Sequence, residues 1–145
     1  MSNRNRNIFV FGFISMCSLV IGLLIYLIFR ENTYISKFVL SHINISLLRD
    51  AFYPIENNFL KYYFVDYLWG LSLSCGLHVI LLPKIKQSFN ITIVVFIIGA
   101  LYEGFQKIDI IGGTGDIADM FLYLLAGLTV NLINFILIKK EEKKK

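Results

Sequence analysis

The feature that most constrains this chain is a series of long apolar runs. The first covers residues 8 to 29, which are 22 residues without a charge. About 20 apolar residues suffice for a helix to cross a bilayer, and a helix pairs its own backbone polar groups there. Three later runs, at residues 64–82, 89–110 and 117–138, have the same character with few charges. The sequence therefore predicts an all-α, polytopic membrane protein with four transmembrane helices.

The remaining segments fit a single membrane domain of 145 residues. The connection at residues 30–63 alternates apolar patches with scattered charges and tyrosines, which is typical of a segment lying at the membrane surface. Pro54 is expected to break this interfacial segment into two pieces. Residues 139–145 are expected to form a basic, solvated tail. The start of the chain, MSNRNRN, is followed by no small-residue cleavage site, so the first run is expected to be a retained anchor.

The two cysteines exclude two kinds of site. Cys17 and Cys75 both fall inside apolar runs, which favours buried thiols over a disulfide framework. The sequence has no paired-cysteine spacing of the kind that holds a metal, so no metal site is predicted, and the sequence leaves any cofactor unknown.

The basic residues predict an orientation, because Lys and Arg gather on the cytoplasmic side of a membrane. Nine of the 14 basic residues fall on the side that carries both termini: Arg4, Arg6, Lys84, Lys86, Lys139, Lys140, Lys143, Lys144 and Lys145. Both termini are therefore expected in the cytoplasm. The net charge of +4 then reports orientation, and a nucleic-acid partner is not expected because the basic residues do not cluster with aromatics on a polar surface.

One apolar stretch, residues 100–127, contains four carboxylates: Glu103, Asp109, Asp116 and Asp119. With four helices, the acids of the later helices fall at the end of the bundle away from the termini, in the outer leaflet, and Asp66 begins the second helix there. Intramembrane ionisable groups face the interior of a bundle, because lipid cannot solvate them. We therefore predict an acidic pocket near the outer leaflet, with these candidate residues: Asp66, Glu103, Gln106, Thr114, Asp116, Asp119 and Tyr123.

Helix geometry gives this pocket an expected register. At 100° and 1.5 Å per residue, Asp119 should lie roughly level with Gln106, and Tyr123 roughly level with Glu103. Glycines on the same faces would let the helices approach closely, and Ala100 with Gly104 is a further small pair. His78, roughly 18 Å deeper than Asp66, stays outside the cluster and is expected to be a hydrogen-bonded core residue.

Simpler roles for the acids remain open. Asp116 and Asp119 stand where an Asp caps the first turn of a helix. Glu103 and Lys107 are four residues apart, in the order that favours an ion pair. Asp66 could mark the membrane boundary. Together these roles do not account for Gln106 and Tyr123, and with Lys107 as the only nearby base they leave negative charge unpaired.

The order YEGFQ, a short loop, then GTGDIAD resembles the VanZ-like family of small bacterial membrane proteins. In that family Glu-x-x-Gln ends one helix, a loop with an Arg follows, and an Asp opens the last helix before an Asn and a Gly. Glu103, Gln106, Asp119 and Gly127 match, and Tyr123 takes the Asn position. The DYLW opening at Asp66 is similar to an uncharacterised branch of such proteins. The loop departs from the pattern, because no Arg lies between Gln106 and Asp119.

This resemblance implies a multi-pass protein of the bacterial cell envelope, from a family whose namesake is associated with resistance to the glycopeptide teicoplanin. The function expected from the residues is non-enzymatic: a pocket for a lipid headgroup, an envelope precursor or a cation. One alternative is a membrane-embedded enzyme in which two carboxylates act as acid and base on an envelope lipid. Another is a scaffold or a subunit of a transport complex, which would need a second copy or a membrane partner.

Overall fold

The structure, a computed structural model, describes residues 3–30, 34–42, 46–52, 57, 59–108, 110 and 115–143. Across these residues the chain forms helices and no strands. In chain order they are α1 (Asn3–Phe29), α2 (Tyr34–Leu40), α3 (Ser46–Phe52), a π-helical turn (Phe59–Phe64), α4 (Val65–Leu81), α5 (Ile85–Lys107) and α6 (Ile117–Glu142). The all-α prediction is confirmed.

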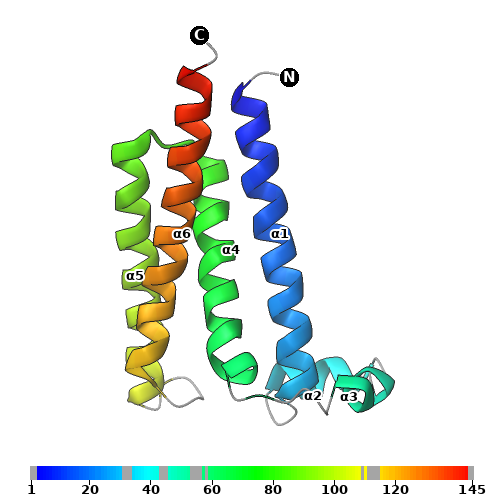
Figure 1. Cartoon of the computed structure of the whole chain (residues 1–145). Coiled ribbons are helices and arrows are strands. Elements are labelled where there is room, and N and C mark those ends of the chain that lie inside the picture. Colours follow the sequence, from blue (N-terminus) through cyan, green and yellow to red (C-terminus); the bar gives the residue numbers. More distant parts are fainter. Residues whose placement is uncertain are drawn as a thin grey trace.

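Four of these helices are long and apolar enough to cross a membrane: Arg4–Phe29, Tyr62–Leu81, Ile85–Lys107 and Ile117–Lys140. They stand side by side, with both chain termini at one end and the short helices α2 and α3 at the other, beside the end of α1 (Figure 1). The predicted multi-pass architecture is therefore confirmed. We call the two ends of the bundle the terminal end and the far end.

Three of the helices, α1, α5 and α6, extend into polar sequence at one end, whereas α4 lies within its predicted run and α5 ends before residue 110. α5 begins at Ile85 and ends at Lys107, whereas residues 89–110 were expected to be helical. α6 continues to Glu142, so most of the expected tail at residues 139–145 is helical. The reason is that a helix does not stop where lipid stops: polar residues such as Lys and Glu are good helix formers in water.

The structure describes a break in the interfacial segment between α2 and α3 that was not predicted. The described chain leaves α2 at residues 41–42 and is helical again from Ser46, whereas the predicted break, Pro54, lies outside the described residues. α3 is tied to the end of α1, because Arg49 Nη2 donates to the Leu27 carbonyl over 2.9 Å. The basic side chain thus occupies one of the carbonyls that the last turn of a helix leaves unpaired.

The turn between α4 and α5 is set by Leu82 and Pro83. Leu82 adopts a left-handed conformation (φ 45°) and its N–H donates to the His78 carbonyl over 3.0 Å, which closes α4. A left-handed conformation costs a residue with a side chain roughly 1–2 kcal/mol. Pro83 then prevents the helix from continuing. α5 starts just beyond, where Lys84 N–H donates to Gln87 Oε1 over 3.1 Å.

α4 lies at the centre of the packing, against α1 on one side and α6 on the other, while α5 packs mainly on α6. Small residues mark the α1–α4 contact. Gly22 lies under the ring of Trp69, and Ser15 Oγ donates to the Ser72 carbonyl over 2.9 Å. The core at this contact contains Phe11 with Cys75, which is buried, whereas Cys17 is half-buried; neither cysteine forms a disulfide.

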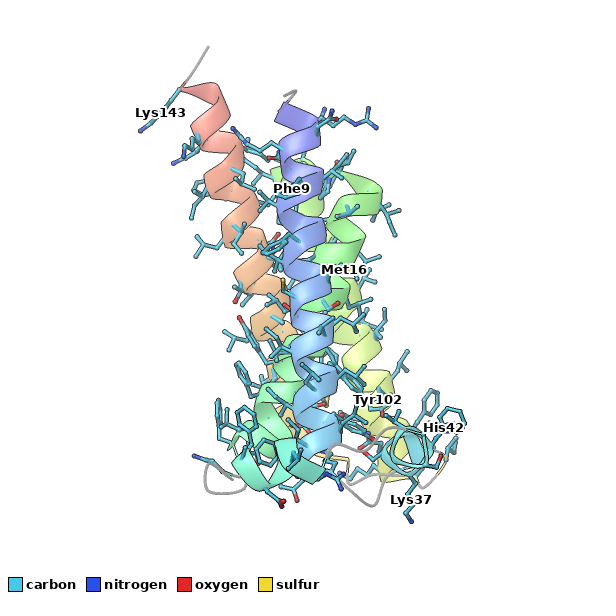
Figure 2. The ribbon with its side chains drawn as sticks, turned by 90° about the vertical axis from the view of Figure 1, so that its right-hand side faces the viewer. Phe9, Met16, Lys37, His42, Tyr102 and Lys143 are labelled. Carbon is cyan, nitrogen blue, oxygen red and sulfur yellow. The ribbon has the colours of Figure 1, made fainter. Side chains whose placement is uncertain are left out.

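The outward faces of the bundle are apolar. Phe9 and Met16 of α1 project from the ribbon in Figure 2, and their exposed fractions are 65% and 62%. Similar large apolar side chains cover the outer faces of α5 and α6. A soluble protein rarely exposes apolar surface on this scale, and a bilayer would cover it.

Candidate functional site

The predicted acids gather at the far end of the bundle. Asp66 lies in the first turn of α4, Glu103 in the last turns of α5, and Asp119 in the first turn of α6. Asp66 and Glu103 are buried, with exposed fractions of 7% and 4%. Each of these three carboxyls interacts electrostatically with the other two or with Asp116 beside them. The structure thus brings together acids that the sequence separates by more than fifty residues.

Glu103 holds the loop that precedes α6. Its Oε2 accepts a hydrogen bond of 3.0 Å from the Asp116 N–H. The alternative role of Glu103, an ion pair with Lys107, is not formed between these two described residues, because Lys107 is exposed and Glu103 turns to the loop. Gly115 makes this contact possible: a Cβ there would lie 2.6 Å from the Glu103 carbonyl oxygen.

Asp116 is the cap of α6. Its Oδ1 accepts from the Ala118 N–H over 3.0 Å, which satisfies one of the unpaired N–H groups of the first turn. Its Oδ2 accepts from the Tyr63 hydroxyl over 3.4 Å. The capping interpretation of Asp116 is confirmed, and the residue is exposed at the edge of the cluster.

Asp66 is paired with a residue that the sequence reading did not include. Arg30, directly after α1, places Nη2 3.8 Å from Asp66 Oδ2. Its guanidinium lies over the rings of Tyr26 and Tyr62, at 5.4 and 5.1 Å from their centroids. Such rings stabilise a cation through their negative faces. The expectation that Lys107 is the only base near the acids is therefore wrong.

A depth argument could have found Arg30. It directly follows Phe29, the last residue of an apolar run, and Asp66 opens the next spanning helix from the same end of the bundle. Residues at the boundaries of adjacent antiparallel helices share a level in the membrane. In the family that the sequence resembles, an arginine lies in the loop that corresponds to residues 107–118. The arginine of this cluster comes instead from the end of α1.

Asp119 differs from the other acids in its hydrogen bonding. Its Oδ1 is buried and has no hydrogen-bond partner among the described residues. It does not cap α6, since the side chain of Asp116 fills that role. Its carboxyl interacts electrostatically with Asp66, Glu103 and Arg30. A buried oxygen of this kind is costly unless something outside the described residues hydrogen-bonds to it.

Tyr123 is wedged between two glycines and has an exposed fraction of 6%. Gly70 of α4 lies against its backbone: a Cβ added at Gly70 would be 3.3 Å from Tyr123 Cα. Gly99 of α5 lies against its ring. Its side chain lies within electrostatic range of Asp66, Glu103 and Asp119. Tyr123 therefore joins the cluster as predicted.

The register of α6 against α5 differs from the expected one. Tyr123 lies level with Gly99, one turn deeper than the predicted level of Glu103. The physical reason is the loop: Gly115 folds back against the last turn of α5, so α6 begins beside Glu103. The predicted register assumed that the loop extends beyond the ends of both helices.

For two predicted residues the structure describes no contact with the cluster. Gln106 is half-buried, and its side chain makes no hydrogen bond with a described residue. Thr114 lies outside the described residues, as does Asp109. The small pair Ala100 and Gly104 is not an interface either, because nothing lies within 4 Å of a Cβ added at Gly104.

A second polar cluster lies nearer the terminal end. His78 is fully buried, with Nδ1 2.8 Å from the Ser74 carbonyl and Nε2 2.7 Å from Ser88 Oγ. Ser88 is hydrogen-bonded to Asn131 Oδ1, and Asn131 Nδ2 donates to Thr92 Oγ1 over 2.8 Å. The prediction of a hydrogen-bonded His78 is confirmed. Ser88, Thr92 and Asn131 were overlooked, although Ser88 and Thr92 share one face of α5.

The charge of His78 and the orientation of Asn131 depend on each other. A carbonyl only accepts, so His78 Nδ1 carries a proton. If Ser88 donates to Asn131 Oδ1, His78 Nε2 must donate to Ser88 and the ring is a cation. If the Asn131 amide is turned over, Asn131 donates to Ser88, Ser88 donates to His78, and the ring is neutral. A buried ring with no acid among its contacts favours the second arrangement.

No group of three or more His, Cys, Asp or Glu side chains in the described part of the chain is arranged to hold a metal ion. Comparison of the chain with family models, curated proteins and solved structures gave no match.

Proposed function

We propose that this chain is a VanZ-like membrane protein of the bacterial cell envelope whose acid cluster binds a cationic, hydrogen-bond-donating headgroup. The observation that carries the proposal is Asp119 Oδ1, a buried carboxylate oxygen with no hydrogen-bond partner among the described residues. Asp66 and Glu103 place further negative charge beside it. An ammonium group would supply both the donors and the charge that this oxygen needs.

The charges of the cluster support the same ligand class. Asp66, Glu103 and Asp119 act on one another, and among the described residues Arg30 is the cation whose charge reaches all three. One guanidinium compensates one carboxylate, so a second cation lowers the electrostatic energy of the site. An envelope lipid or lipid-linked precursor with an amino group has that charge at the depth of the cluster.

The proposed topology places both termini in the cytoplasm and the acid cluster in the outer leaflet. It rests on the basic residues of the terminal end, which exceed those of the far end in the sequence. The cluster then faces lipid-linked intermediates on the outer side of the cell membrane.

The test is a ligand-dependent melting shift with the full chain in detergent. Phosphatidylethanolamine, whose headgroup carries an ammonium, is expected to raise the Tm of the wild type, whereas phosphatidylglycerol is not. A ligand at about 100 times its Kd stabilises by about 2.7 kcal/mol, which is several degrees for a protein of this size. Asp119→Asn is expected to abolish the shift, because an amide does not supply the charge.

Asp50→Asn is the matched control. Asp50 is an exposed acid on α3 at the same end of the bundle, so its substitution changes the net charge equally. It should keep the full phosphatidylethanolamine shift. Equal shifts in Asp119→Asn and Asp50→Asn would sink the proposal.

The enzymatic alternative rests on Glu103 and Asp119 alone. Ser74, Ser88 and His78 could have supplied a nucleophile and its base, but they belong to the second polar cluster. His78 is hydrogen-bonded there to the Ser74 carbonyl and to Ser88 Oγ. A scaffold or transport role remains a prediction about partners. We propose neither as the main function, because neither accounts for the buried oxygen of Asp119.

A further inference from the structure

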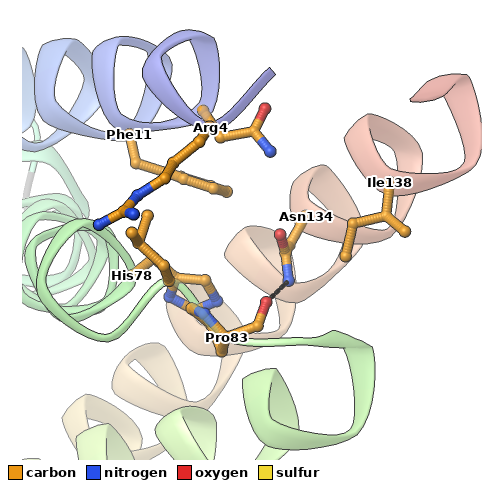
Figure 3. Close-up of a pocket in the computed structure, with 8 residues that line it drawn as sticks. Arg4, Phe11, His78, Pro83, Asn134 and Ile138 are labelled. Carbon is orange, nitrogen blue, oxygen red and sulfur yellow. Dashed lines mark hydrogen bonds between the residues drawn. The ribbon is translucent and has the colours of Figure 1, made fainter. Parts of the chain in front are cut away.

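A pocket of about 390 Å³ opens at the terminal end of the bundle, far from the acid cluster. It lies where α1, α4 and α6 meet, and Figure 3 shows Arg4, Phe11, His78, Pro83, Asn134 and Ile138 around it. Its volume is in the range of small-molecule sites, about 300–1,000 Å³. Neither the predicted function nor the acid cluster uses this pocket.

The polar part of the lining suits an anion. Arg4 of α1 contributes a guanidinium, and no Asp or Glu is among the residues around the pocket. Asn134 of α6 is nearly buried and is held in place by donating from Nδ2 to the Pro83 carbonyl over 3.4 Å. His78 contributes the surface of its ring, because both of its nitrogens are engaged elsewhere.

The apolar part of the lining suits a chain next to that anion. Phe11 is packed against the His78 ring, with centroids 5.1 Å apart, and Ile138 closes the α6 side. An arginine beside apolar walls is the lining that an amphiphile with a charged head requires. A small inorganic anion would leave those walls without a partner.

The surroundings reinforce the charge of the pocket. The terminal end carries Arg6, Lys84, Lys86, Lys139, Lys140 and Lys143 in addition to Arg4. Basic residues at the surface of a bilayer attract anionic lipids, and basic pockets between transmembrane helices bind their headgroups.

We propose that this pocket binds an anionic phospholipid from the leaflet at the terminal end of the bundle. The lipid phosphate pairs with Arg4, where a guanidinium can donate two parallel hydrogen bonds, and the adjoining glycerol and acyl carbons lie against Phe11 and Ile138. The proposal is independent of the function of the acid cluster, since the two sites lie at opposite ends of the bundle and take ligands of opposite charge.

The test measures lipid retention by native mass spectrometry of the full chain, with phosphatidylglycerol and phosphatidylcholine as probes. Arg4→Gln is expected to weaken phosphatidylglycerol binding about ten-fold, as loss of a charge-assisted bidentate contact does, and to weaken phosphatidylcholine binding less, because its choline cation offsets the charge of its phosphate. Lys143→Gln is the matched control. It removes one charge from an exposed position at the same end that does not line the pocket, and should change binding less than about two-fold.

A second variant keeps the test decisive if Arg4→Gln folds poorly. Ile138→Trp fills the pocket without a change of charge and should also displace phosphatidylglycerol. Three results would overturn the proposal: equal weakening by Arg4→Gln and Lys143→Gln, equal retention of both lipids by the wild type, or full competition by inorganic phosphate. The last result would assign the pocket to a free anion.

Discussion

Arg30 is the residue on which the charge balance of the acid cluster depends. It leaves the end of α1, lies over Tyr26 and Tyr62, and reaches Asp66 at 3.8 Å. The two rings and the carboxylate hold the guanidinium from several sides, so it cannot leave Asp66 without giving up those contacts. The buried Asp66 would then lack its cation. The side chains at this end are therefore coupled, and the changes in unfolding free energy caused by single substitutions there should not be additive.

A double-mutant cycle tests this coupling. Arg30→Gln should destabilise the protein, because it leaves the Asp66 carboxylate buried without its cation. The cost should be below the roughly 3–5 kcal/mol of a fully buried pair, since the Arg30 side chain is 26% exposed. Adding Asp66→Asn should restore part of the stability lost. Denaturant unfolding in detergent measures both, and strictly additive effects of the two changes would contradict the pairing.

At the scale of elements, the approach of α5 to α4 and α6 depends on glycine at particular positions. Gly99 and Gly70 accommodate Tyr123, and Gly127 lies against Thr92. In a membrane, where apolar side chains gain little by leaving lipid, close backbone approach is a main source of helix association. The glycines therefore set where Tyr123 can lie, and with it the inner wall of the acid cluster.

Two glycines on the same helix make a matched pair. Gly99→Ala places a methyl group on the Tyr123 ring and should cost about 1–3 kcal/mol, the range for overpacking. Gly104→Ala, five residues along α5, meets nothing within 4 Å and should be neutral or stabilising by up to ~1 kcal/mol, because alanine favours a helix. Thermal melting in detergent compares them. A larger loss for Gly104→Ala would show that the packing of α5 differs from this structure.

At the scale of the whole molecule, what the sequence predicts well is what the bilayer itself enforces. An apolar run such as residues 8–29 must be helical because lipid offers its backbone no other partner, and four such runs bring the termini to one end. The same reasoning placed Asp66, Glu103 and Asp119 at the other end. Their gathering into one cluster agrees with that depth argument.

What the sequence could not predict depends on contacts between elements. The register of α6 against α5 differs by one turn from the predicted one, because Gly115 packs back on α5. No short-range sequence pattern in the loop indicates this packing. Arg30 was counted as a loop charge because its partner, Asp66, is 36 residues away. The hydrogen bonds from His78 to Ser88 and on to Asn131 require the relative rotation of three helices, which single-helix periodicity does not give.

The proposed orientation can be tested by labelling. In a background with Cys17→Ala and Cys75→Ala, a single cysteine replaces Lys37 of α2 or Lys143 beyond α6, both exposed and at opposite ends of the molecule (Figure 2). A membrane-impermeant maleimide added to intact cells should label the cysteine at position 37. The one at position 143 should react only after the cells are opened. The reverse pattern would place the acid cluster on the cytoplasmic side.

α1 has a mechanical consequence for both polar sites. It is 27 residues long, about 40 Å, and bears Arg4 near its start while Arg30 follows its end. Its contact with α4 near the middle is between small side chains, Ser15 and Ser72. Phe11 and Gly22 also contact α4, on either side of this point, so α1 is held along its length. One helix thus fixes the separation of Arg4 and Arg30, and with it the distance between the two polar sites.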